Sequence, residues 1–149
     1  MFDINLTITG LQERQDQNLR SIAALRPDGE FGEAVREAVT MLHRYAVSIT
    51  HVGRYKQSKS GHWYYDKAGP GVGGGALRAS HRMEVAGLYG RVYIDPAATN
   101  PRTGTRTGLY GIYENARGGS HAFYDRTISE YGDVVMNRVG RRVAFAVVT

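Results

Sequence analysis

The sequence of 149 residues contains no cysteine. This absence excludes disulfides, cysteine-based metal sites and catalytic thiols together. Long apolar runs are missing as well, since no stretch approaches the roughly 20 consecutive apolar residues that span a membrane. The N-terminal residues show no basic segment followed by an apolar run, which is the pattern of a secretion signal. These absences predict a protein that makes no membrane contact and is synthesised in a reducing cytoplasm.

The motifs of common enzyme classes are also missing. The run GPGVGGG at 69–75 lacks the Lys-Ser/Thr of a P-loop and the spacing of a dinucleotide fingerprint. No serine stands in a Gly-x-Ser-x-Gly elbow. The histidines lie apart, without the spacing of metal ligands, at His43, His51, His62, His81 and His121. We therefore predict no metal, no cofactor and no enzymatic activity.

Periodic patterns in the first half predict one strand and two helices. Residues 2–8 alternate between apolar and polar side chains, which is typical of a half-buried strand. A mostly polar helix is expected at 11–25, ended by a turn at 27–29. The strongest helical pattern spans about 32–51, where apolar side chains recur at steps of three and four: Val35, Ala38, Leu42, Tyr45 and Ile49.

The second half predicts further strands and one more helix. Alternating runs at 77–85 and 91–95 flank a glycine-bearing turn and indicate an antiparallel pair. Glu114 is expected at the end of a strand, and a last helix at about 122–142 precedes a closing strand at 143–148. Residues 53–75 and 96–108 have no sustained period and are expected to form extended loops or arms.

This order of elements predicts an α+β fold in one domain of residues 1–149. A small, mainly antiparallel sheet should pack against two to three helices, with long loops between them.

Positive charge exceeds negative charge, with a formal net charge of +5 and a pI of about 9.6. A basic surface attracts polyanions such as nucleic acids. The excess is scattered along the chain, but two local groups stand out: Arg54, Lys56 and Lys59, and Arg102 and Arg106.

The second half also carries an ordered set of short motifs. Leu77-Arg78-Ala79-Ser80 comes first, the strand at 90–95 follows, then Tyr110-Gly111-Ile112-Tyr113-Glu114, and His121-Ala122-Phe123 opens the last helix. This order, over about residues 75–142, resembles the HK97 gp10-like family of phage neck and tail-completion proteins. The residues that carry the resemblance as structural motifs are Leu77, Ser80, Glu114, His121 and Phe123.

The resemblance implies a structural protein of a tailed phage, assembled in the host cytoplasm and located in the neck or tail of the virion. Copies of the chain would form a closed ring, a hexamer or dodecamer, around the DNA channel. Its neighbours would be the head-tail connector and the tail-tube or terminator proteins. Arg54, Lys56, Lys59, Arg102 and Arg106 would line the channel and contact packaged DNA without reading its sequence. The resemblance does not distinguish a neck protein from a tail terminator.

Aromatic residues indicate where a partner would bind. Tyrosine and tryptophan are enriched at protein interfaces because one end of the side chain is apolar and the other is wet. The run at 63–65 stands in an irregular segment, where a monomer has difficulty burying it. The predicted interface residues are Trp63, Tyr64, Tyr65, Tyr110 and Tyr113. Stacking of nucleic-acid bases on these rings is the alternative.

A second reading of the same residues is a small basic nuclease or nucleic-acid-binding protein. Glu114 and His121 could act as an acid–base pair in a metal-independent ribonuclease. His62 would be a further catalytic candidate, and Arg102 and Arg106 would hold phosphate. The structural reading is simpler, because Glu114 can bond to neighbouring backbone amides and His121 can cap the last helix.

Overall fold

A computed structural model of the protein describes residues 11–65, 72–73 and 75–148. The strand predicted at 2–8 lies outside the described residues. The elements are α1 (Leu11–Ala24), α2 (Glu30–Ile49), β1 (Arg54–Gln57), β2 (Trp63–Tyr65), β3 (Val72–Gly73), α3 (Ala76–Ala79), β4 (His81–Ala86), β5 (Tyr89–Ile94), α4 (Thr107–Ala116), the 3₁₀ turn η1 (Gly119–His121) and α5 (Phe123–Val148).

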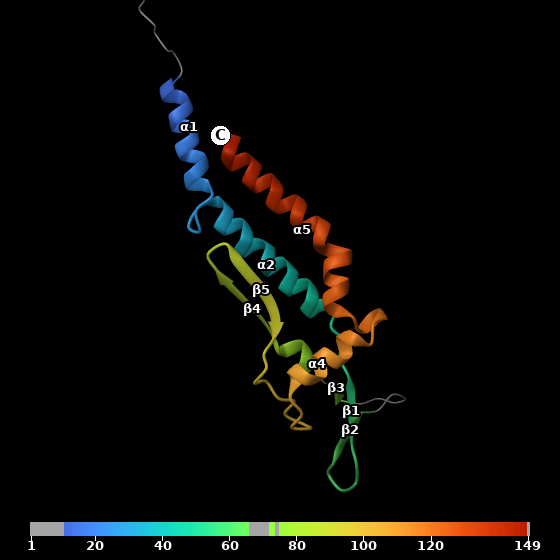
Figure 1. Cartoon of the computed structure of the whole chain (residues 1–149). Coiled ribbons are helices and arrows are strands. Elements are labelled where there is room, and N and C mark those ends of the chain that lie inside the picture. Colours follow the sequence, from blue (N-terminus) through green and yellow to red (C-terminus); the bar gives the residue numbers. More distant parts are fainter. Residues whose placement is uncertain (1–10, 66–71, 74, 149) are drawn as a thin grey trace, which may run out of the picture.

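The long helix α2 forms the centre of the molecule. It packs against α5 on one side and against the β4–β5 hairpin on the other, and α1 joins α5 at the far end (Figure 1). The Tyr45 ring stacks on the Tyr131 ring of α5 with 4.6 Å between centroids, and its hydroxyl donates to Glu130 at 2.7 Å. The predicted apolar stripe of α2 thus lies between two partners, which is why Ala34, Val39 and Ala46 beside it are buried.

The hairpin β4–β5 is antiparallel, with His81 opposite Ile94 and Ala86 opposite Tyr89. Two residues connect the strands, and Gly87 has φ of 61°, as the first position of a tight hairpin turn with a glycine requires. A side chain at Gly90 would overlap Val39 of α2. The glycine therefore allows the hairpin to lie directly on the helix.

Residues 77–79 differ from the prediction of a strand. They form the single helical turn α3, and the strand begins only at His81. Gly75, with φ of 89°, starts the turn, and the Ser80 hydroxyl donates to the Leu77 carbonyl at 2.7 Å. The Arg78 guanidinium donates to the Thr50 carbonyl at 2.7 Å, just past the C-terminal end of α2. The local bond of Ser80 and the long-range bond of Arg78 together outweigh the alternating pattern.

Residues 53–75 are not only a loop. They contain three short antiparallel strands in the order β2-β1-β3, with Lys56 opposite Tyr64 and Tyr55 opposite Val72. Each strand has four residues or fewer, too short for a period of two to stand out in the sequence. Residues 96–106 do form a loop, closed by a bridge between Thr99 and Arg106, and α4 begins at Thr107.

Two other predicted strand assignments are wrong. Glu114 lies inside helix α4 and not at a strand end, and residues 143–148 continue α5 and do not form a closing strand. The β-branched valines at the end of α5 have a strand preference of only a few tenths of a kcal/mol each, roughly. Extending an existing helix adds a hydrogen bond for every residue fixed, so the helix continues.

The predicted α+β class is confirmed: the antiparallel strands are packed with helices. The strands form one three-stranded and one two-stranded sheet where a single small sheet was expected. Within the described residues no helix is both long and apolar enough to cross a membrane.

Candidate nucleic-acid interface

The two basic groups of the sequence come together at one end of the molecule. Arg54, Lys56 and Lys59 lie on β1 and its turn to β2, and Arg102 and Arg106 lie on the loop 96–106. Figure 1 shows this loop and the β1–β2 hairpin at the same end. The loop and the hairpin are joined where the Arg102 guanidinium lies over the Trp63 ring, with 5.0 Å between the guanidinium carbon and the ring centre. We call β1, β2, β3 and the loop 96–106 the basic end.

The basic end accounts for the net charge of the protein. Residues 50–65 and 96–106 contain five Lys and Arg residues and no Asp or Glu. The whole chain has 19 cationic and 14 acidic side chains, so 19 − 5 leaves 14 cations, which balance the 14 carboxylates. The rest of the chain is therefore neutral, and the charge of +5 belongs to one end.

Internal hydrogen bonds give the loop 96–106 a defined shape. The Asn100 amide N–H donates to the Thr105 carbonyl at 2.8 Å, and the Asn100 side chain accepts from the Arg102 N–H at 2.9 Å. The Thr107 hydroxyl donates to the Ala98 carbonyl at 2.9 Å. Asn100 and Thr107 are both buried, so the two loop arginines extend from a fixed frame.

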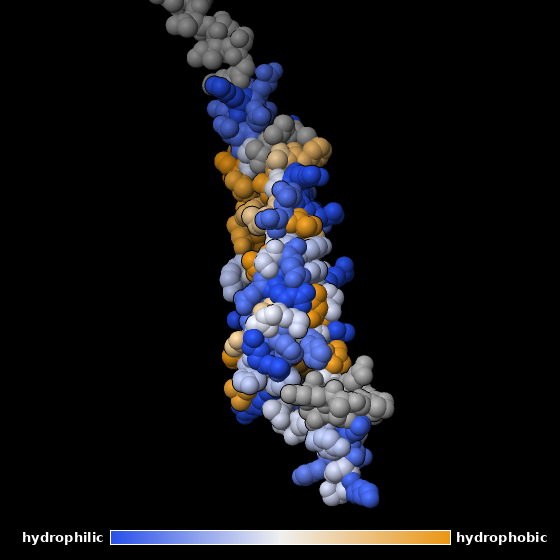
Figure 2. Space-filling view, turned by 90° about the vertical axis from the view of Figure 1, so that its right-hand side faces the viewer, coloured by the Kyte–Doolittle hydropathy of each residue, from blue (hydrophilic) through white to orange (hydrophobic). Residues whose placement is uncertain are grey.

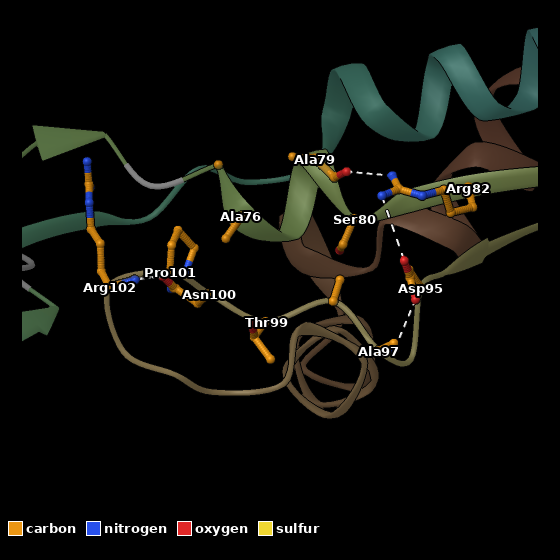
Figure 3. Close-up of a pocket in the computed structure, with 12 residues that line it drawn as sticks. Ala76, Ala79, Ser80, Arg82, Asp95, Ala97, Thr99, Asn100, Pro101 and Arg102 are labelled. Carbon is orange, nitrogen blue, oxygen red and sulfur yellow. Dashed lines mark hydrogen bonds and ion pairs between the residues drawn. The ribbon is translucent and has the colours of Figure 1, made fainter.

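An open hollow of about 560 Å³ lies between this loop and the start of the β4–β5 hairpin (Figure 3). Arg82 spans its rim, donating to the Ala79 carbonyl at 2.7 Å and lying 3.7 Å from the Asp95 carboxylate. Asp95 in turn accepts from the Ala97 N–H at 2.9 Å. Arg102 stands on the opposite side of the hollow from Arg82 (Figure 3).

Aromatic residues of the basic end line a smaller cavity of about 230 Å³. His51, Trp63, Tyr64 and Tyr110 all line it. Three of them, Trp63, Tyr64 and Tyr110, are predicted interface residues from two distant segments, and the fold brings these segments together. His51 was not among the predicted site residues, because nothing in the sequence around it indicates that the end of α2 faces this cavity.

A buried carboxylate fixes α4 beside this cavity. Glu114 is 4 % exposed and accepts two hydrogen bonds from the Arg117 guanidinium, at 3.0 and 3.1 Å. Nδ1 of His121 lies 2.6 Å from Oε2 of Glu114, although the ring N–H is not well directed at this oxygen. Burial alone would raise the pKa of the Glu114 carboxyl. Hydrogen bonds from Arg117 and Tyr110, together with the close contact of the His121 ring, outweigh burial and lower that pKa, so the group is ionised.

The other predicted interface residues differ in exposure. Trp63 is half-buried under Arg102, Tyr64 is half-exposed, and Tyr113 is exposed on α4. The side chains of Tyr65 and Arg54 lie outside the described residues. Lys56 is half-buried, whereas Lys59 and Arg106 are exposed.

The motif residues lie at the junction of the elements. Leu77, Ser80 and Phe123 are buried there together with His81. The Thr50 hydroxyl donates to the Ala46 carbonyl at 2.6 Å, so it must accept the bond from His81 Nε2 at 2.9 Å. Burial, with a smaller effect of His43, lowers the pKa of His81 to about 4, and the ring is neutral.

The residues of the nuclease alternative do not form one constellation. His62 is exposed beside the β1–β2 turn, whereas His121 contacts Glu114 and the ring of His51, at 5.3 Å between centroids. In the part of the chain that the structure describes, no group of three His, Asp or Glu residues could hold a metal ion. Comparisons with protein-family models, curated proteins and solved structures gave no match.

Proposed function

We propose that the protein is a ring-forming subunit of a phage neck or tail-completion complex, located in the virion, whose basic end contacts the packaged DNA. The observation that carries this proposal is the location of the net charge. Five cations without a carboxylate in the same two segments belong to a short sheet and a fixed loop, while the rest of the chain is neutral. Such a surface attracts phosphate regardless of base sequence, as a channel through which any DNA must pass requires.

The surface of the remaining molecule supports assembly. Among the described residues, seven apolar side chains are buried, whereas fourteen large apolar side chains are at least 44 % exposed. Figure 2 shows hydrophobic side chains interrupting the hydrophilic surface along the helices, while the end with β1 and β2 is hydrophilic. Exposed apolar surface of this extent is typical of subunits that bind neighbours. A closed ring would cover it by repeating one heterologous contact.

The DNA contact is tested by the salt dependence of binding to a duplex of arbitrary sequence. One variant replaces Lys56, Lys59, Arg102 and Arg106 by Gln. The control variant replaces Arg14, Arg26, Arg44 and Arg141, four exposed arginines outside the basic end, and therefore has the same net charge. Each lost phosphate contact should reduce the slope of log affinity against log salt by roughly 0.9. Equal slopes for the two variants would contradict a specific DNA-facing end.

Assembly is tested by measuring the mass of the purified protein, alone and with a neighbouring neck protein. A ring subunit should form a closed oligomer in at least one of these samples. A protein that stays monomeric in both, cleaves RNA and loses that activity on His121→Ala would instead be the nuclease of the second reading.

A further inference from the structure

Strand β5 has one edge to which no other described strand is paired. Its partner β4 lies on one side only, and the pairing is Ala86 to Tyr89 next to the turn. In an antiparallel ladder the residues alternate between bonding to the partner and pointing away from it. With Tyr89 bonded across the turn, the backbone groups of Gly90, Val92 and Ile94 point away from β4. No backbone bond joins these three to another element in the described chain. An open edge of this kind is a template for another strand.

An apolar groove of about 580 Å³ runs along this edge, between β5 and α4. Val92, Tyr93 and Ile94 all line it. Consecutive residues of a strand point to opposite faces of a sheet, so a groove on one face would be lined by alternate residues. This groove is lined by three consecutive residues and therefore lies along the edge of the strand. The other wall carries Leu109 and Ile112, which are 67 % and 72 % exposed.

We propose that residues 2–8 of a neighbouring copy bind in this groove as an added strand on β5. The segment FDINLTI alternates between apolar and polar side chains, as a strand does when one face is buried. Added strands gain affinity from main-chain hydrogen bonds and specificity from alternate side chains. The charges also match, because Asp3 is the one charged residue of the segment and Arg106 is the one charged residue that lines the groove.

The reach of the chain assigns the segment to a neighbour. The C-terminal end of α1 leads to the hairpin turn, where a side chain added at Gly87 would lie 3.6 Å from Cβ of Pro27. From there α1, with 14 residues, leads away from the hairpin for about 21 Å (Figure 1). The six residues from Asn5 to Leu11 span at most about 21 Å. Asn5 therefore reaches no further than the turn of its own hairpin, and Val92 lies three residues past Tyr89, about 10 Å further along the strand.

This inference rests on the proposed ring and specifies its contact. The donor segment precedes α1, and the acceptor groove lies between β5 and α4, so each copy uses two different surfaces. A contact between two different surfaces is the heterologous kind that closes into a ring.

Cysteine cross-linking tests the contact, because the chain has no native cysteine. Purified Leu6→Cys protein is mixed with Val92→Cys protein and treated with a short bifunctional thiol reagent. The control mixture combines Leu6→Cys with Ser129→Cys, an exposed position on α5. We expect a covalent dimer of the two chains in the first mixture, at least about tenfold above the control.

A charge exchange provides the second measurement, made on the mass of the assembled protein. Asp3→Arg should reduce assembly, and Arg106→Asp in the same chain should restore it. Cross-linking that occurs only inside one chain, in a Leu6→Cys/Val92→Cys protein, would overturn the assignment to a neighbour. Rings that form without the intermolecular cross-link, and that Asp3→Arg leaves unchanged, would overturn the strand contact while the proposed function stands. Absence of any oligomer would overturn both.

Discussion

The helices and the basic end of this molecule are organised by different forces. The α2–α5 pair buries Ala46, Phe123 and Val135, and ion pairs such as Arg142 with Glu30 at 2.8 Å join its surface. At the basic end, no described side chain of β1 or β2 is fully buried, and residues 50–65 and 96–106 contain five cations and no carboxylate. The helices are stabilised mainly by apolar burial, whereas the basic end holds like charges together at some cost in repulsion.

This difference fits the proposed function, in which the helices keep the fold and the basic end binds DNA. Surface ion pairs contribute little each, so the stability of the helical part depends on its few buried side chains. The five cations at the other end form the kind of surface to which a ligand of opposite charge, as in the proposed function, is attracted.

The largest effect on stability is expected from Phe123→Ala. Phe123 is 2 % exposed at the start of α5, between the rings of His81 and Tyr124. Its truncation should lower the free energy of unfolding by about 3–5 kcal/mol, measured by urea denaturation. Phe145→Ala is the matched control, since Phe145 in the same helix is 72 % exposed and should lose less than about 1 kcal/mol. Equal losses would show that Phe123 is not in the core.

Protonation of His81 should be the next largest effect. Its pKa is about 4 in the folded protein against 6.5 when unperturbed, so between these values the unfolded state binds more protons. Stability should therefore fall as the pH is lowered from 6.5 towards 4, by up to about 3 kcal/mol. The neighbouring titratable groups are His43 and Tyr124, and burial raises the pKa of Tyr124 to about 12.

Urea midpoints measured across this pH range check the effect. The His81→Gln variant should be less stable at pH 7 but should lose this part of the pH dependence. His62→Gln, at an exposed position outside the helices, is the control and should keep it. A pH dependence that survives in His81→Gln would assign it to another group.

Glu114→Gln should have an intermediate effect. The variant keeps the shape of the side chain but removes the charge that Arg117 and His121 contact. We expect a loss of about 1–3 kcal/mol in the free energy of unfolding at pH 7. Because the pKa of the carboxyl is lowered from 4.5, its contribution is complete above that pH and disappears as the pH falls through the folded pKa. Wild type and variant should therefore converge in stability at acid pH, and a constant difference would contradict this.

The long helices could be predicted from the sequence, but their neighbours could not. Helix α2 has five apolar side chains at helical spacing, and the structure places its ends within two residues of the prediction. The turn α3 depends on Arg78 reaching the end of α2, a contact between residues 28 positions apart. The run at 143–148 is apolar and β-branched, and only its continuity with α5 makes it helical.

In the candidate site, too, the local segments could be predicted from the sequence but the contacts between them could not. Each basic group is visible in the sequence, but the basic end exists because Trp63 and Arg102 meet, and no local pattern encodes that contact. The sequence suggests Glu114 and His121 as an acid–base pair because of their residue types, and in the structure the two side chains lie in contact. Its geometry, with Arg117 as the main partner of the carboxylate, was not foreseen.

The smallest effect on stability, and the most informative for the comparison, is expected from Trp63→Leu. This change keeps an apolar side chain on β2 but removes the ring under Arg102. A cation over an exposed ring contributes roughly 0.5–1 kcal/mol, so the urea midpoint should move little. DNA affinity should fall more than stability does, because Arg102 loses the platform that orients it. The urea midpoint and the DNA affinity are also measured for Arg102→Lys, since lysine keeps the charge but is a poorer match to the ring. If Trp63→Leu destabilised the protein as much as Phe123→Ala, the two ends would form one cooperative core, and the division between a stabilising part and a binding part would fail.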